Sequence, residues 1–189
     1  MNQALFSYIA ACPTAFQAAA HTAALLEAEG YRPLRETEEW MLEPGGRYYV
    51  TRNGSSLIAF RLPKGRPVGF MMTAAHGDSP TFKIKENAEL TGENETRLSV
   101  EGHGGMLCAS WMDRPLSVAG RAMVRTENGV AMHLIDLHDD LALIPNVAIH
   151  MNRDANNGAK YNFAVDMQPL YGEKGGFHRR IAEAAGVAE

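Results

Sequence analysis

The first strong pattern along the chain is a set of apolar positions at helical spacing. Between Phe16 and Leu26 the apolar residues recur every three or four positions, which places them on one face of a helix. Thr14 is a residue type that caps the start of a helix, and Gln17 three positions later completes a capping box. Gly30 is the residue type at which helices end. Together they predict one helix from the threonine to the glycine.

A strand pattern follows the predicted helix. Runs rich in Tyr, Val, Ile and Phe at 47–52 and 55–62 flank Asn53-Gly54, which predicts a β-hairpin. Residues 68–75 form a continuous apolar run, as expected of a strand buried on both faces of a sheet. The polar cluster 76–80 comes directly after it. Because open α/β sheets build their sites at the carboxyl ends of strands, a site is predicted there.

Beyond Glu86 the strands become short and alternate between apolar and polar residues. Such alternation predicts a separate and more antiparallel module. We therefore expect an α/β fold with domains 1–86 and 87–189. A short strand is expected at 82–85, just before this boundary. The elements expected beyond it are strands at 97–101, 121–126 and 130–136, a hairpin turn at 127–129, loops at Gly102, Gly104, Gly105 and 152–158, and a helix at 177–187.

Composition and charge narrow the classes of partner. The 189 residues are 46% apolar and 21% charged, as in globular proteins, and a formal net charge of −4 gives no basic surface for nucleic acid or an anionic membrane. The longest apolar run is too short to cross a bilayer, and the N-terminus lacks the basic region of a signal peptide. We therefore expect a cytoplasmic protein in which Cys12 and Cys108 are buried free thiols.

The sharpest local candidate for chemistry is His76-Gly77-Asp78. Neutral imidazole is a favoured zinc ligand, and a carboxylate often fixes the orientation of such a histidine through its second ring nitrogen. A strand-end turn in which Asp78 acts as a cap explains the same residues. The tripeptide alone leaves both interpretations open.

Two later positions also leave alternatives. Asp113 beside Arg114 predicts either a buried ion pair that braces a loop or a substrate contact, and the bracing role is the simpler one. His150 follows an apolar segment and precedes a polar loop, where a lone histidine is usually structural. His138 stands in an acidic stretch that is typical of a solvated turn.

Ordered segments across nearly the whole chain resemble the aspartyl aminopeptidase family of zinc metallopeptidases. The matching residues are Tyr48-Tyr49-Val50, Phe60, Ala75-His76-Gly77-Asp78-Ser79-Pro80, Lys83-Ile84-Lys85, Glu101, Gly104-Gly105, Trp111, Asp113-Arg114, Leu116-Ser117, Ala119-Gly120-Arg121, Ile144-Pro145, Ala148-Ile149-His150 and Arg153. The chain departs from the family at Gln17, Gly77 and His103, where members usually carry His, Thr and Tyr.

This resemblance implies a role for each candidate. His76 would bind zinc and Asp78 would orient it, in a site of two zinc ions that activate a bridging water. His150 would be offered across a dimer interface as a hydrogen-bond donor to the transition state in the neighbouring subunit. Peptides with acidic N-terminal residues would be the substrates. Residues 1–86 would belong to a catalytic α/β domain and 87–189 to a dimerisation module of a homo-oligomer.

The same resemblance places the family's remaining metal ligands and its general base further along than Glu189. The chain is therefore expected to be an N-terminal portion of the enzyme, inactive by itself, with at most a partial zinc site. The alternative is a non-catalytic fragment that self-associates through the dimerisation module.

Overall fold

The computed structural model describes residues 2–172 and 174–188 and is a mixture of helices and β-sheets. It divides into two compact units, the first ending at Ser79 and the second beginning at Pro80. The mixed α/β character expected from the sequence is confirmed. The assignment of functions to 1–86 and 87–189 stays a prediction.

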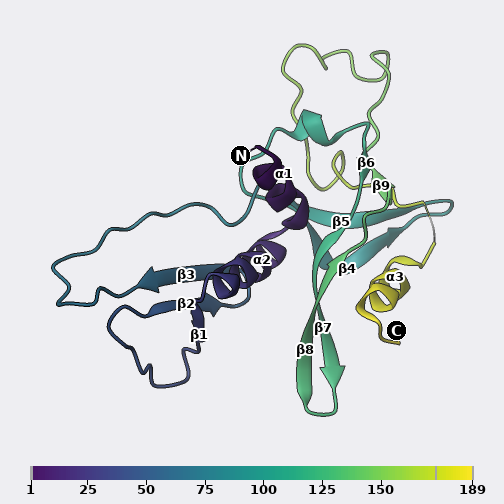
Figure 1. Cartoon of the computed structure of the whole chain (residues 1–189). Helices are drawn as coiled ribbons and strands as arrows, with labels where there is room; N and C mark the ends of the chain where they lie inside the picture. Colours follow the sequence, from purple (N-terminus) through teal and green to yellow (C-terminus); the bar gives the residue numbers. More distant parts are fainter. Residues whose placement is uncertain (1, 173, 189) are drawn as a thin grey trace. The chain divides into compact units, whose positions relative to one another are not determined.

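The first unit is a small three-stranded sheet with a helix beside it (Figure 1). Its strands occur in the order β1-β2-β3; β1 is parallel to β2, and β3 is antiparallel to it. The elements are α1 (Asn2–Ala11), α2 (Ala15–Ala28), β1 (Arg32–Leu34), β2 (Arg47–Arg52) and β3 (Ser56–Arg61). The predicted helix and hairpin are confirmed, whereas α1 and β1 were not foreseen.

Local signals explain why α2 and the hairpin form where they do. The hydroxyl oxygen of Thr14 accepts a hydrogen bond from the backbone N–H of Phe16 at 3.2 Å, which caps α2. Gly30, with φ of +78°, follows the last turn of the helix. In the hairpin, Asn53 and Gly54 both have positive φ, 54° and 62°, as a tight two-residue turn between twisted strands requires.

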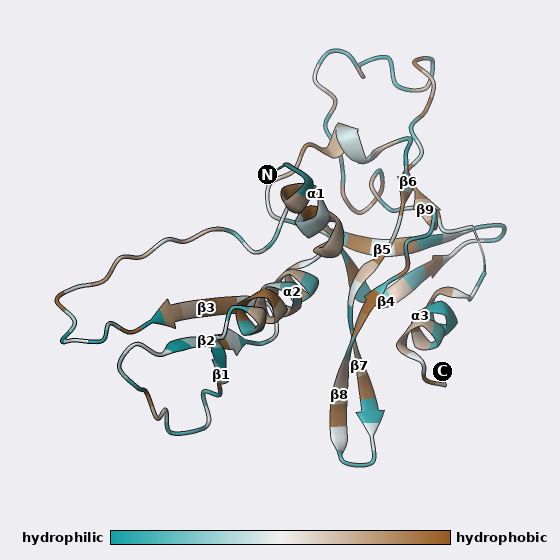
Figure 2. Cartoon of the chain, in the orientation of Figure 1, coloured by the Kyte–Doolittle hydropathy of each residue, from teal (hydrophilic) through white to brown (hydrophobic). Residues whose placement is uncertain are grey.

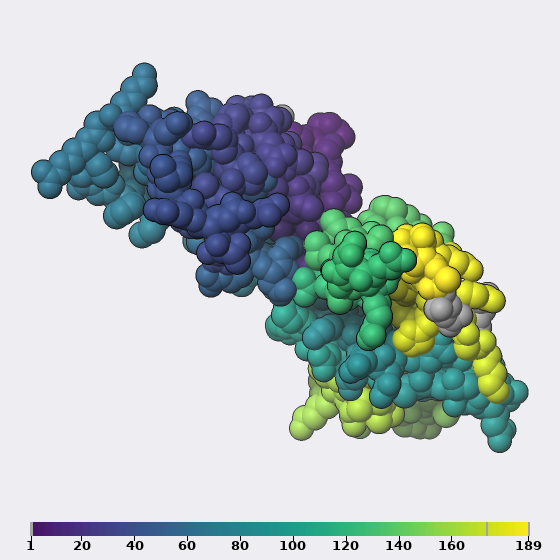
Figure 3. Space-filling view, turned by 90° about the horizontal axis from the view of Figure 1, so that it is seen from below, coloured from purple at the N-terminus to yellow at the C-terminus, as the bar shows by residue number. Residues whose placement is uncertain are grey.

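The apolar run 68–75 does not form the predicted buried strand. After β3 the chain is extended without strand pairing, and in Figure 3 the part coloured for residues of about 60–75 projects from its unit. Val68 and Met71 are fully exposed at 102%, and Phe70 is 90% exposed. A strand buried on both faces needs hydrogen-bonded neighbours and covering layers. The described residues pair no strand with this run, so its apolar pattern is left unsatisfied.

The second unit is built from antiparallel strand pairs around an apolar core. The core residues are Ala88, Leu98, Val100, Ala142 and Phe177. The elements are β4 (Thr81–Thr91), β5 (Thr96–His103), the 3₁₀ helix η1 (Cys108–Trp111), β6 (Pro115–Leu116), β7 (Ala119–Thr126), β8 (Gly129–Asp136), β9 (Ala142–Leu143) and α3 (Phe177–Ala185). The pairs are β4–β5, β6–β9 and β7–β8, so the predicted antiparallel character is confirmed.

Two details of β5 and α3 complete the picture. Gly102, expected in a loop, lies inside β5 and pairs with Phe82. The ring of Phe163 occupies the space that a side chain at this position would take. Helix α3, predicted at 177–187, begins where Glu89 of β4 accepts the N–H of Phe177 at 2.7 Å. Figure 2 shows hydrophilic and hydrophobic colours on different parts of this helix. No helix among the described residues is long and apolar enough to span a membrane.

Candidate functional site

His76 and Asp78 form a hydrogen-bonded pair in the extended segment after β3. Nδ1 of His76 lies 3.1 Å from Oδ1 of Asp78. The histidine side chain is 93% exposed and that of the aspartate 42% exposed. A carboxylate bonded to Nδ1 holds the proton there and leaves the lone pair of Nε2 directed outward. The pair thus has the donor set of one oriented imidazole ligand.

The surroundings of this pair differ from the sequence expectation. Because 68–75 is not a strand, His76 does not stand at the carboxyl edge of a sheet within the first unit. Across 2–172 and 174–188, no three His, Cys, Asp or Glu side chains lie close enough together to hold a metal ion. A zinc ion bound by protein normally takes at least three side-chain ligands. The described residues therefore offer one oriented ligand and no complete zinc centre.

His150 belongs to the second unit and lies in an exposed turn. The N–H of Met151 donates to the carbonyl oxygen of Ala148 at 2.8 Å, and that of Asn152 donates to the same oxygen at 3.3 Å. This turn closes around His150 and presents it at the surface. An exposed imidazole on a hydrogen-bonded turn can reach a group outside its own unit.

Asp113 connects η1 to the start of the His150 loop. Its Oδ1 accepts the backbone N–H of Asn146 at 2.8 Å, and its own N–H donates to the carbonyl oxygen of Ile144 at 2.9 Å. Arg114 donates instead to the carbonyl oxygen of Ser110 at 3.5 Å, and both Asp113 and Arg114 are exposed. The predicted buried ion pair is therefore wrong, because the carboxylate bonds to backbone. Asp113 holds the loop through these backbone contacts, without Arg114.

The long loop that carries His150 is held near its C-terminal end by Gln168, which the sequence did not single out. The buried side chain of Gln168 accepts the N–H of Val100 at 2.8 Å and donates to the carbonyl oxygens of Val100 and Phe163. The ring of Phe163 packs on Phe82, with ring centroids 5.7 Å apart. Val100 lies 68 positions from Gln168 in the sequence, so no local pattern predicts this contact.

Other candidates resolve into ordinary structure. His138 and Asp139 are exposed, so this acidic stretch is solvated as predicted. Nε2 of His138 also lies 3.1 Å from Asp136, and Asp139 pairs with Arg180. Cys12 and Cys108 are both free, as expected, but each is only partly buried.

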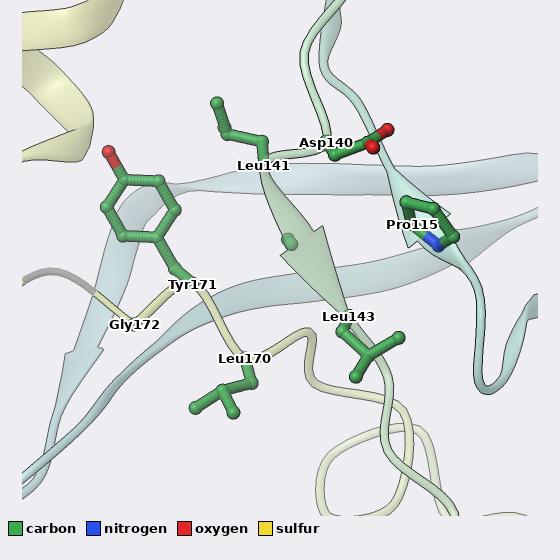
Figure 4. Close-up of a pocket in the computed structure, with 8 residues that line it drawn as sticks. Pro115, Asp140, Leu141, Leu143, Leu170, Tyr171 and Gly172 are labelled. Carbon is green, nitrogen blue, oxygen red and sulfur yellow. The ribbon is translucent and has the colours of Figure 1, made fainter.

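The second unit has a shallow hollow with leucine side chains in its lining. Figure 4 shows Leu141, Leu143, Leu170 and Tyr171 around it, with Asp140 at its rim. The hollow measures about 330 Å³, and its lining is mostly apolar. This composition suits packing against another surface better than catalysis.

Comparisons with known proteins agree on one family. A family model described as "Aminopeptidase I zinc metalloprotease (M18)" matches residues 8–185. The Probable M18 family aminopeptidase 2 of Pseudomonas fluorescens is 45% identical over 181 residues, which are 95% of this chain and 42% of that protein. The chain thus spans well under half the length of this curated relative.

Solved structures give the same result. In the cryo-EM structure of the Ape4 and Nbr1 complex, one chain superposes with a TM-score of 0.83 at 34% identity, over 92% of this chain and 34% of that one. The structure of Chaetomium thermophilum mApe1 gives a TM-score of 0.86 at 28% identity, over 99% of this chain and 47% of that one. The family match covers most of the sequence and both compact units. The chain therefore belongs to the M18 family of aminopeptidase I zinc metalloproteases, the family of aspartyl aminopeptidases.

Proposed function

We propose that this chain is the N-terminal part of a zinc-dependent aminopeptidase that removes N-terminal, acidic residues from peptides. Residues 1–86 contribute to the catalytic α/β domain, and 87–189 form the dimerisation module of a homo-oligomer. The observation that carries the proposal is the oriented pair His76–Asp78 within a chain whose family match runs from residue 8 to 185. The free cysteines suit a cytoplasmic, reducing compartment.

The pair fits zinc as one ligand of a larger set. Asp78 holds the proton of His76 on Nδ1, so that Nε2 binds the metal, and the remaining ligands come from polypeptide outside these residues. When bound, zinc activates a water molecule and polarises the scissile carbonyl group. In this proposal the role of the described residues is to supply His76 as a ligand and to orient it through Asp78.

The exposed apolar run supports the same assignment. Val68, Phe70 and Met71 are almost fully exposed to solvent in this structure. Exposing an apolar run of this length to water is unfavourable in free energy. If neighbouring strands come from the rest of the enzyme, 68–75 becomes a central strand, and His76 then leaves its carboxyl end. The fraction of the curated relative that this chain spans, 42%, leaves enough polypeptide to supply those strands.

His150 serves a second catalytic role in this proposal. Its exposed turn offers the imidazole to the active site of a neighbouring subunit, where it donates a hydrogen bond to the oxyanion of the transition state. The zinc ions do not depend on this donor. His150→Ala should therefore lower turnover and leave the zinc content unchanged.

The second candidate function is non-catalytic self-association through 87–189. The observation that favours it is the lack of a three-residue metal cluster within 2–172 and 174–188. In that case the purified chain forms oligomers, holds no tightly bound zinc and does not hydrolyse peptides in any combination.

The test uses an extended enzyme, in which this chain is joined to the C-terminal part of the Pseudomonas fluorescens relative that it does not cover. Turnover of aspartyl and glutamyl substrates is measured for the chain alone, for the extended enzyme and for both after zinc removal. The proposal predicts activity only in the extended, zinc-loaded form. Extended enzyme that binds zinc and folds but cleaves no N-terminal residue would contradict it.

A further inference from the structure

We infer that Asp113 is a positioning residue for His150, because its carboxylate fixes the root of the loop that carries the histidine. This inference rests on the proposed role of His150 and adds a residue on which that role depends. The loop leaves Ile144, which is completely buried. His150 lies four positions after Asn146, which Asp113 holds.

The backbone at Asp113 is strained in a way that serves this contact. Its φ is +55°, a left-handed conformation that non-glycine residues adopt rarely and that Asp and Asn tolerate best. The other non-glycine residues with positive φ among the described residues are Asn53, in the hairpin turn, and His138, in the loop after β8. At Asp113 the conformation lets the N–H reach the carbonyl of Ile144 while Oδ1 reaches the N–H of Asn146.

The two hydrogen bonds act together as a clamp. One bond joins the N–H of Asp113 to the carbonyl oxygen of Ile144, and the other joins its carboxylate to the N–H of Asn146. Two points of the loop are thus held, which fixes the path of the chain toward Ala148. The carbonyl oxygen of Ala148 then accepts the hydrogen bonds that close the turn at His150. A bond from N–H to a carboxylate is stronger than one between neutral groups. Without it, the turn is free to move relative to η1.

Three substitutions separate the carboxylate from the backbone conformation. Asp113→Asn keeps an acceptor oxygen and tolerates positive φ. Asp113→Gly keeps the backbone conformation and removes the acceptor. Asp113→Ala removes both. If Asp113 acts through its side chain, the asparagine variant should hold the His150 loop as the parent does, and the glycine variant should not hold it.

The first measurement is amide hydrogen exchange by NMR on the 189-residue chain. Asp113→Gly should speed exchange at Asn146 and Met151 about tenfold, as expected for the loss of one such bond, while Met132 in β8 stays unchanged. Asp113→Asn should restore slow exchange to within about twofold. Equal exchange in the asparagine and glycine variants, or an effect that stops at Asn146, would overturn the inference.

The second measurement is a double-mutant cycle on turnover in the extended enzyme. Asp113→Gly should lower kcat about tenfold when His150 is present, with KM nearly unchanged, and should have no further effect in a His150→Ala background. Equal losses in both backgrounds would show that Asp113 does not act through His150, and the role of His150 would stand. If His150→Ala alone leaves kcat unchanged, the proposed role of His150 fails, and the positioning inference fails with it.

Discussion

Two close contacts, one at Tyr49 and one at Gly102, show how single residues help to hold each unit together. Tyr49, at 6% exposed, donates its hydroxyl to the carboxylate of Glu27, which ties β2 to α2. Gly102 lies so close to Phe163 that an added Cβ would be 2.6 Å from its ring. The contact of Tyr49 depends on its hydroxyl being protonated, whereas the contact at Gly102 depends on the absence of a side chain. The first is therefore tested by pH and the second by substitution.

The hydrogen bond to Glu27, and then burial, raise the pKa of Tyr49 from 10.0 to about 12. Because the folded pKa is the higher one, the stabilisation is complete below pH 10 and is lost as pH rises through about 12. The difference in free energy of unfolding between the parent and Tyr49→Phe should therefore shrink over this range. Urea titrations at a series of pH values measure it, with Tyr161→Phe as the control. A difference that stays constant to the highest pH would contradict the role of this bond.

Gly102→Ala should destabilise the second unit by about 1–3 kcal/mol, because the new methyl group must displace the ring of Phe163. That ring also contacts Phe82, so it has little room to yield. Gly105→Ala is the matched control, since nothing among the described residues lies within 4 Å of the place that its methyl group would take. Denaturant unfolding of the two variants gives the comparison. Equal stability of both would show that the packing at Gly102 is looser than described.

Among the elements, α3 is held to the sheet by charge as well as by packing. Phe177 at its start is buried and belongs to the core, and Glu89 of β4 accepts the N–H of that residue. In Figure 3 this helix, in yellow, lies against other parts of the second unit. A carboxylate at a helix N-terminus satisfies a free N–H and interacts favourably with the helix dipole.

Glu89→Ala should lower the free energy of unfolding by about 1 kcal/mol and speed amide exchange at Phe177. Glu89→Gln keeps an acceptor and loses only the charge, so it should fall between the alanine variant and the parent. Circular dichroism during urea unfolding, together with hydrogen exchange, measures both effects. Identical behaviour of the glutamine and alanine variants would show that the hydrogen bond contributes nothing and that only the charge matters.

Elements governed by local signals could be predicted from the sequence, and those governed by distant partners could not. The cap at Thr14 and the turn at Asn53-Gly54 are specified by neighbouring residues, so α2 and the β2–β3 hairpin were found. Helix α1 has exposed apolar side chains, Leu5 and Phe6 among them, and carries no such signal. The run 68–75 has the pattern of a buried strand, but burial needs partners that the described residues do not contain.

The candidate site divides in the same way. The contact of His76 with Asp78 spans two positions and was readable from the tripeptide. The contact of Asp113 with Asn146 spans 33 positions, and that of Gln168 with Val100 spans 68. Sequence spacing cannot specify such pairs without the fold, and for this reason the ion pair expected between Asp113 and Arg114 was wrong.

At the scale of the whole molecule, the proposed function requires that this chain supply part of an active site and that further polypeptide complete it. The oriented imidazole of His76 lies in the first unit and the exposed imidazole of His150 lies in the second, and the described residues bring no three metal-ligating side chains together. The chain alone should therefore bind zinc weakly and show no aminopeptidase turnover, because a single histidine neither retains the ion nor provides a base. Zinc-dependent turnover by the purified chain would contradict this expectation.

The most direct test of the account is the zinc content of the extended enzyme with and without His76. After dialysis, His76→Ala should retain clearly less zinc than the parent and lose turnover, because an oriented ligand has been removed. His178→Ala, which replaces an exposed histidine of α3, is the matched control and should keep both. Full zinc content and undiminished turnover in His76→Ala would contradict the central claim that this histidine holds the metal.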